Sequence, residues 1–148
     1  MSKNTINIVN RRVSYEYHIL QKYTAGLVLS GTEVKSLRDG NANLQEGFCF
    51  FREGELYIKN LQISIFKQGT ISNHEPLRTR KLLLKKVELR KLKSKSEEKG
   101  ISIVPIKIFF SETGYAKIEI ALAQGKKLFD KREDIKKRDI EREIARYK

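Results

Sequence analysis

Apolar alternation in two neighbouring runs constrains the fold of this chain more than any other feature. Every second residue is apolar across 101–110 and again across 115–123, and the turn sequence Glu112-Thr113-Gly114 lies between the runs. This pattern predicts a β-hairpin with one buried face. The residues expected to share that face are Val104, Ile106, Ile108 and Phe110 on the first strand and Ala116, Ile118, Ile120 and Leu122 on the second. Because Pro105 has no N–H to donate, the first strand should be an edge strand or carry a bulge there.

Four more runs have the composition of strands, and they cover residues 15–22, 25–30, 47–52 and 55–63. Glu53-Gly54 separates the last two runs and predicts a second hairpin. Gly26 marks a bend or a bulge in the second run. Cys49 lies on one of these strands and is expected in the core, and a single cysteine allows no internal disulfide.

Two helices are predicted between the strands. A short helix runs from Glu33 to about Arg38, with Thr32 as its N-cap and Asp39-Gly40 as its stop. A longer helix covers residues 77–98, which contain no Gly or Pro, and it begins beside Pro76.

Together these elements predict a mainly β fold with helices. Six strands in hairpins, with the long helix between the fourth and fifth, favour a partly open, six-stranded antiparallel β-barrel of the oligonucleotide-binding type. A half-open α+β sandwich is the alternative. Residues 1–129 would form the barrel domain, and residues 130–148 would form a flexible basic C-terminal tail.

The positive charge of the chain is concentrated in two segments. Residues 76–99 contain ten Lys or Arg against three acids, and residues 125–148 contain ten against six, so the two segments hold +11 of the net charge of +13. Cations that neutralise phosphates gain free energy by releasing condensed counterions, which makes nucleic acid the expected partner. An anionic membrane surface and a merely solubilising charge are the alternatives.

The basic tail has the spacing of a helix. Acids precede cations by four residues at Glu133/Lys137 and Asp134/Arg138, which is the favourable orientation. The helix is short and weakly apolar, so alone in water it should be marginal. We expect it to be disordered when free and to order against RNA, and a helix docked on the barrel is the alternative. The cations expected to contact phosphates are Lys136, Lys137, Arg138, Arg142 and Arg146.

The sequence contains no evident nucleophile, base or metal site of the kind that catalysis needs, and no enzymatic activity is expected. The two histidines, His18 and His74, are expected to have structural roles, with His74 making a hydrogen bond in a turn. No spacing of His, Cys or carboxylates is typical of a metal site, and no Gly-rich phosphate loop is present, so no cofactor is expected. The apolar runs are far shorter than the ~20 residues that span a bilayer, and a cytoplasmic location is expected.

Unpaired RNA bases commonly stack on aromatic side chains. Most of the candidates for such stacking are expected to be core or strand-face aromatics instead. The candidates are Tyr15, Tyr17, Tyr23, Tyr57 and Phe66.

Several strings occur in a fixed order along the chain. They are Ala25-Gly26-Leu27, Gly31-Thr32-Glu33-Val34-Lys35-Ser36-Leu37-Arg38, Asn73-His74-Glu75-Pro76-Leu77-Arg78, Arg80-Lys81-Leu82-Leu83-Leu84, and Gly125-Lys126-Lys127 through Asp130-Lys131-Arg132. From about Asn10 to Arg132 the chain resembles the SsrA-binding protein family, also called small protein B.

The resemblance implies an oligonucleotide-binding barrel that binds the tRNA-like domain of transfer-messenger RNA. Such a protein delivers that RNA to stalled ribosomes for trans-translation, without catalysis of its own. It further implies a monomer, a complex that includes elongation factor Tu, and a tail that becomes helical in the decoding centre and mRNA channel of the small subunit. A general ribosome-associated RNA-binding protein without a delivery role is the alternative.

The resemblance also implies site residues. Asn10 and Lys117 match family positions associated with RNA binding. Thr24 stands where the family often has an acid implicated in RNA binding, and Lys85 stands where a His is common. The other implied RNA-binding residues are Glu33, Lys35, Arg38, Lys126 and Lys127, and the implied ribosome-binding tail residues are Asp130, Lys131, Arg132, Lys136, Lys137, Arg138, Arg142 and Arg146.

Overall fold

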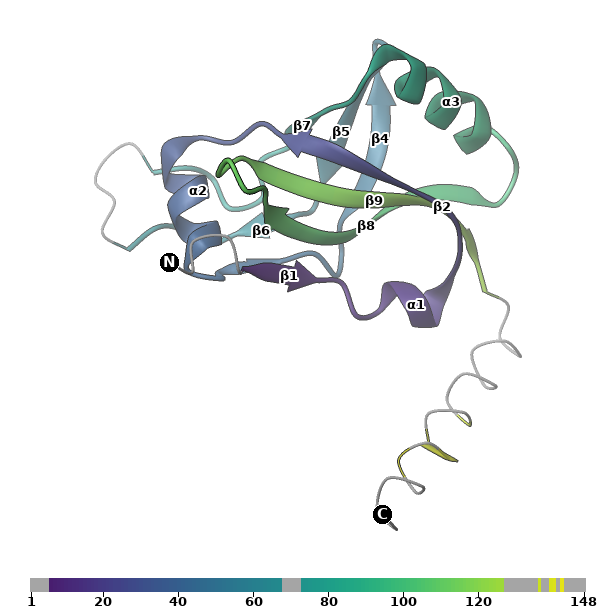
Figure 1. The fold of residues 1–148 in the computed structure, drawn as a ribbon, viewed down its shortest axis with the longest axis horizontal. Helices are drawn as coiled ribbons and strands as arrows, with labels where there is room; N and C mark the ends of the chain where they lie inside the picture. Colours follow the sequence, from purple (N-terminus) through teal and green to yellow (C-terminus); the bar gives the residue numbers. More distant parts are fainter. Residues whose placement is uncertain (1–5, 68–72, 127–135, 137–138, 141, 143–148) are drawn as a thin grey trace.

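Six antiparallel strands close into a ring in the computed structural model, which describes residues 6–67, 73–126, 136, 139, 140 and 142 (Figure 1). The ring runs from β8 through β4, β5, β7, β2 and β9 and returns to β8. Its members are β2 (Tyr17–Leu27), β4 (Phe48–Arg52), β5 (Glu55–Lys59), β7 (Arg80–Leu83), β8 (Ile101–Phe110) and β9 (Ala116–Gly125). The predicted six-stranded, barrel-like fold is therefore confirmed.

Short elements surround the ring. β1 pairs with the second half of β8, while β3 and β6 form a separate two-stranded sheet. The helices α2 and α3 lie at opposite ends of the barrel, and α1 lies beside the start of β2 (Figure 1). The bounds are β1 (Asn7–Val9), α1 (Val13–Glu16), α2 (Gly31–Arg38), β3 (Ala42–Asn43), β6 (Gln62–Ile63) and α3 (Lys86–Ser96).

The predicted hairpin of β8 and β9 is confirmed, and Pro105 marks a bulge. The register between the two strands shifts between Pro105 and Lys107. The bulge turns Val104 away from the main core, so Val104 packs in a small second cluster with Val13 and Ala123. Ile106 also packs against this second cluster, whereas Ile108 and Phe110 lie in the main core. The prediction that all four apolar residues of this strand share one face is therefore wrong.

The β4–β5 hairpin is also as predicted. Its two turn residues, Glu53 and Gly54, have φ angles of 51° and 79°, and such positive values match the twist of the flanking strands. Leu56 and Ile58 are fully buried. Cys49 is buried as expected, and its burial raises the pKa of the thiol far above the ordinary value.

The runs 15–22 and 25–30 are not two strands, contrary to the prediction. A single long strand, β2, covers Tyr17–Leu27 and pairs with β9 along most of its length. Its irregularity lies between Ile19 and Gln21 rather than at Gly26. Gly26 instead sits between β9 and β7, where an added Cβ would lie 3.4 Å from the Cβ of Leu83.

The predicted helix over 77–98 is wrong in its first half. Arg80–Leu83 forms strand β7, and helix α3 begins only at Lys86. Arg80 and Leu82 point inward in β7 and are fully buried, while Leu83 is exposed. The predicted number of six ring strands is therefore correct, but the predicted strands are not all the observed ones. Two predicted runs form the single strand β2, and the sequence did not predict β7.

Candidate nucleic-acid interface

Strand register places Lys117 in the middle of an outward-facing row of side chains. Lys117 on β9 lies opposite Gly26 on β2 and opposite Phe109 on β8. Gly26 lies opposite Leu83 on β7, and Phe109 lies opposite Asn7 on β1. Residues opposite one another in an antiparallel sheet project from the same face. None of the five is buried, so the row crosses the outside of five strands.

A second outward row runs beside the first and contains Thr24. Thr24 lies opposite Glu119, and Glu119 lies opposite Lys107, which in turn lies opposite Val9. Lys22 Nζ lies 4.0 Å from Glu119 Oε1. Thr24 is exposed, so this position offers a hydroxyl to a ligand, with Lys22 on the same strand and Glu119 and Lys107 on the next two strands.

The two rows also carry an aromatic ring that the sequence reasoning did not single out. The Nζ of Lys107 lies 5.5 Å from the centroid of the Phe109 ring. Phe109 occupies the alternate position to the predicted buried residues of its strand, and this alternation could have identified it as outward-facing.

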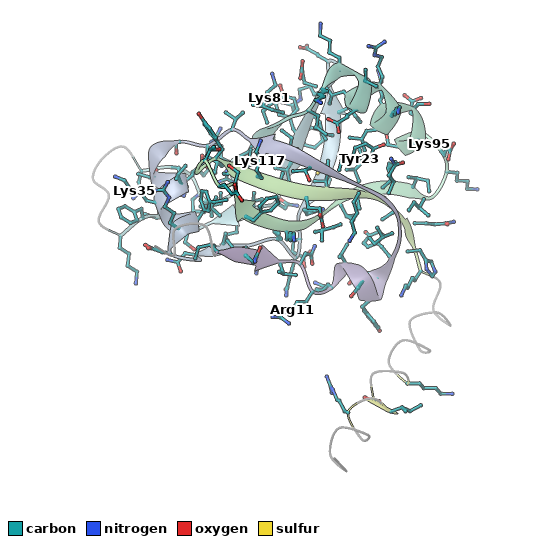
Figure 2. The ribbon with its side chains drawn as sticks, in the orientation of Figure 1. Arg11, Tyr23, Lys35, Lys81, Lys95 and Lys117 are labelled. Atoms are coloured by element: carbon teal, nitrogen blue, oxygen red, sulfur yellow. The ribbon has the colours of Figure 1, made fainter. Side chains whose placement is uncertain are left out.

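Exposed cations surround the barrel rather than forming one patch. Figure 2 shows Lys117 and Lys81 on the strands in the middle of the view, Lys35 on α2 and Lys95 on α3. Arg11 lies on the opposite side of the view from Lys81, near α1 (Figure 2). A large polyanion could therefore meet positive charge on several faces.

Helix α2 begins differently from the prediction, because its N-cap is Ser30 and not Thr32. The backbone N–H of Ser30 donates to Glu33 Oε1 at 2.8 Å. Thr32 is used elsewhere, since its hydroxyl lies 2.8 Å from His74 Nδ1. His74 Nε2 lies 2.8 Å from the carbonyl oxygen of Ile63, which can only accept, so Nε2 donates and Nδ1 accepts from Thr32. The predicted hydrogen-bonding role of His74 is confirmed.

Glu33 does not fit a direct RNA contact, because its side chain has no exposed surface. Its carboxylate binds the guanidinium groups of two arginines that follow the loop after β6. Arg78 Nη2 donates to Glu33 Oε1 at 2.7 Å, and Arg80 Nε donates to Glu33 Oε2. Arg80 is itself fully buried and donates further to the Leu61 carbonyl at 2.7 Å.

This buried charge cluster consists of Glu33 and Arg80, which have no exposed surface, together with Arg78, whose side chain is 41% exposed, and it fixes α2 to β7. Burial alone would raise the pKa of Glu33, but hydrogen bonds from Arg78, the Ser30 backbone and Arg80, with the charge of Arg80, lower the pKa to about 2. Burial lowers the pKa of Arg80 from its ordinary value, and Glu33 opposes that change. The carboxylate is therefore ionised and serves to position α2.

Lys35 and Arg38 on α2 are exposed, as RNA contacts must be. Lys35 Nζ lies 5.6 Å from the centroid of the Phe66 ring, and Arg38 Cζ lies 5.5 Å from that of Phe110. The charged groups of both side chains therefore lie within cation–π distance of aromatic rings, and both residues remain exposed to solvent.

Asn10 is placed in the interior, with only 6% of its surface exposed. Its Nδ2 donates to the carbonyl oxygens of Pro105 at 3.1 Å and Leu44 at 3.4 Å. Its Oδ1 is buried and has no partner within the described part of the chain. Asn10 therefore ties the end of β1 to the bulge in β8, and it also lines a cleft that includes Arg12 and Tyr17.

Lys126 lies where the chain leaves the barrel. Its Nζ donates to the carbonyl oxygen of Ser14 at 2.9 Å, and its backbone N–H donates to that of Glu16 at 2.8 Å. These bonds fix the end of β9 against α1. The predicted residues Lys127, Asp130, Lys131, Arg132, Lys137, Arg138 and Arg146 lie outside the described residues.

Two of the predicted tail residues are described. Lys136 and Arg142 are helical and exposed. Of the proposed stacking aromatics, Tyr23 is in the core, whereas Tyr57 is half-buried and projects outward opposite Lys81. Tyr15, Tyr17 and Phe66 are half-buried.

Within 6–67, 73–126 and the four described tail residues, no group of three or more His, Cys, Asp or Glu side chains could hold a metal ion. No helix among these residues is long and apolar enough to cross a membrane.

The ring of strands, with lysines and aromatic rings on its outside, defines an oligonucleotide-binding type of β-barrel. The comparison with known families is more specific. The model of the SmpB protein family matches residues 7–148, and this chain belongs to that family.

Curated relatives agree with this membership. The chain is 53% identical over 143 residues to the SsrA-binding protein of Cytophaga hutchinsonii, covering 97% of this chain and 94% of the relative. It is 54% identical over 137 residues to the SsrA-binding protein of Desulforudis audaxviator, covering 93% of this chain and 89% of the relative.

A solved structure described as "tmRNA-SmpB: a journey to the center of the bacterial ribosome" contains a chain of similar fold. The TM-score is 0.71 at 50% sequence identity, and the match covers 83% of this chain and 86% of the other.

Proposed function

We propose that this protein binds the tRNA-like domain of transfer-messenger RNA and delivers that RNA to stalled ribosomes for trans-translation. The observation that carries the proposal is membership of the SmpB family over residues 7–148, with relatives named SsrA-binding protein at more than 50% identity. The exposed cations on the barrel supply the phosphate contacts that such a role requires.

The outward face around Lys117 is the proposed contact surface of the barrel. Lys117, Thr24 and the α2 residues Lys35 and Arg38 reach solvent and can meet RNA directly. Lys126 acts from a partly enclosed position, whereas the buried Asn10 acts indirectly, by fixing the end of β1 to the bulge in β8. Glu33 positions α2 instead of contacting RNA.

The tail is proposed as a second functional surface. Residues 1–129 bind the RNA, while residues 130–148 are disordered when free and become helical in the decoding centre and mRNA channel of the small subunit. Their acid–cation spacing at i,i+4 supports helix formation, and their low apolar content explains why binding is needed to stabilise it. Lys127 would join the RNA contacts of the barrel.

We infer that the protein acts as a monomer in the cytoplasm, without catalysis, on RNA that also carries elongation factor Tu. The relatives are named for binding SsrA and not for a reaction, which supports the non-catalytic role.

A binding experiment tests the RNA partner. The protein should bind the isolated tRNA-like domain of transfer-messenger RNA, and an excess of bulk tRNA should compete weakly. Equal competition would favour the alternative, a general ribosome-associated RNA-binding protein without a delivery role.

Removal of the tail tests the separation of the two surfaces. Deletion of residues 131–148 should leave affinity for the tRNA-like domain within about threefold, a change of less than 1 kcal/mol. The same deletion should abolish peptide tagging on stalled ribosomes. Loss of RNA binding on deletion would place the tail in the first interface instead.

A further inference from the structure

Aromatic side chains gather on the outer face of the β4–β5 hairpin. Phe50 lies opposite Tyr57, and Phe48 lies opposite Lys59. Phe48 is 43% exposed, and Phe50 and Tyr57 are half-buried. At the alternate positions of the same strands, Cys49, Leu56 and Ile58 are buried and Phe51 packs against the core, so the aromatic rings of the outer face are not needed to fill the barrel interior.

The rings form a row with a guanidinium over it. The ring centroids of Phe50 and Tyr57 are 6.0 Å apart with 26° between the ring planes, and those of Phe48 and Phe50 are 6.2 Å apart with 47°. Arg52 Cζ lies 5.4 Å from the Phe50 centroid and 5.6 Å from the Tyr57 centroid. Flat groups of this kind are the surfaces on which unpaired bases stack.

Positive charge flanks the aromatic row. Lys59 and Arg52 are exposed on its two sides, and Lys81 lies opposite Tyr57, 3.7 Å from Glu55. A cleft runs beside β4, with Phe48 and Phe50 on one side and Ser96 at the end of α3 on the other. The last turn of α3 carries two further lysines. Arg52 on β4, Lys59 on β5 and Lys81 on β7 therefore place positive charge on three strands around the aromatic row.

We propose that this face is a stacking platform for unpaired bases of single-stranded RNA, formed by Phe48, Phe50, Arg52 and Tyr57. The bases stack on the rings or on the guanidinium plane, and the flanking lysines meet the phosphates. Lys81 connects the platform to the Lys117 row, because Lys81 and the row member Leu83 project from the same side of β7.

The charge around the rings decides between RNA and an apolar protein segment as the occupant. Arg52, Lys59 and Lys81 rim the platform, and the whole chain carries a net charge of +13. A polyanion is complementary to such a surface, whereas an apolar segment would offer no charge to Arg52 and Lys59.

The proposal can be tested with two short single-stranded oligoribonucleotides of equal length. The first oligomer carries 2-aminopurine among ordinary bases. The second has abasic sites at the positions where the first has bases, so the two have the same number of phosphates. Full-length protein should bind the first oligomer more tightly and should quench its 2-aminopurine fluorescence, because the base stacks.

Ring removal should abolish this preference. Phe50→Leu and Tyr57→Leu should each weaken binding of the base-containing oligomer by on the order of tenfold, the usual effect of losing one base–aromatic stack. Affinity for the abasic oligomer should not change, which also shows that the variant is folded. Arg52→Lys keeps the charge and loses the planar group, so it should reduce the preference in the same way.

Two matched variants serve as controls. Tyr57→Phe keeps the ring and should behave as the wild type. Tyr115→Leu removes a more exposed ring, in the β8–β9 turn, and should leave both affinities unchanged.

Equal binding of the two oligomers by the wild type would overturn the proposal, as would a preference that survives all three platform variants. If a leucine variant fails to fold, the Arg52→Lys variant tests the proposal instead, because Arg52 is exposed and its replacement should leave the fold intact. Neither oligomer contains a tRNA-like domain, so this result is independent of whether the protein binds transfer-messenger RNA.

Discussion

The same kinds of charged residue have different roles in the buried cluster at α2 and on the outward face around Lys117. In the buried cluster, Glu33 and Arg80 have no exposed surface and their ionic groups are enclosed by hydrogen bonds. On the outward face, Lys22 and Glu119 pair loosely at 4.0 Å and remain in contact with solvent. Burial, rather than residue type, thus separates the charges that hold the barrel together from those available to RNA.

The strongest test of this difference is to remove one partner of the buried ion pair between Glu33 and Arg80. Arg80→Met should destabilise the fold by about 3–5 kcal/mol, because it leaves the buried Glu33 carboxylate without the one of its two arginine partners that is itself fully buried. Urea unfolding followed by circular dichroism measures the change. The matched surface variant, Arg90→Met on α3, should change the free energy of unfolding by less than about 0.5 kcal/mol.

A double variant, Glu33→Leu with Arg80→Met, tests the physical reason. Removing both charges should recover part of the lost stability, since the cost arises from an unpaired buried charge. If the double variant is as unstable as the sum of the two single variants, the ion pair is not what links α2 to β7.

Acid should destabilise the fold through the buried cluster. The pKa of Glu33 is lowered to about 2 from an ordinary value of 4.5. Its contribution to stability is therefore fully present above about pH 4.5 and is lost as the pH falls towards 2, a loss on the order of 3 kcal/mol. The free energy of unfolding, measured between pH 6 and pH 2, should fall more steeply for the wild type than for Glu33→Gln. Parallel curves would contradict the assigned role of Glu33.

The buried cluster also shows where sequence reasoning reaches its limit. Alternation correctly predicted the β8–β9 and β4–β5 hairpins, because their inward positions are apolar. It missed β7, whose inward positions are Arg80 and Leu82. A buried arginine looks like a surface residue in the sequence, and its partner Glu33 lies 47 residues away, so only the folded chain shows that the two neutralise each other.

The predicted site residues also separate into outward-facing and inward-facing ones, which the sequence alone does not distinguish. Lys117 and Thr24 were implied by resemblance, and the structure places them on one exposed face because strand pairing aligns β9 with β2. Glu33 belongs to the same signature string as Lys35 and Arg38, yet it points inward while they point outward. Their spacing along the short helix α2 places Glu33 on a different face from Lys35 and Arg38. The sequence of the helix alone does not show which of these faces the barrel covers.

On the outward face, a charge should affect binding and not folding. Lys117→Ala should weaken binding of the tRNA-like domain about three- to tenfold and reduce the magnitude of the salt slope by about 1, because one phosphate contact is lost. The free energy of unfolding should stay within about 0.5 kcal/mol of the wild type. Lys117→Arg keeps the charge and should retain most of the affinity. An unchanged affinity of Lys117→Ala at low salt would remove this face from the interface.

The smallest effect is expected for the carboxylate beside Thr24. Glu119→Gln removes a loose ion pair with Lys22, so the loss of stability should be within about 0.2–1 kcal/mol. The same change removes a negative charge next to Lys107 and frees Lys22, so affinity for RNA should rise slightly at low salt and the gain should disappear at high salt. Affinity should be measured by titration of the tRNA-like domain at two salt concentrations. A lower affinity at low salt would show that Glu119 itself contacts the RNA, and the acid on this face would then count among the binding residues rather than among the charges that oppose binding.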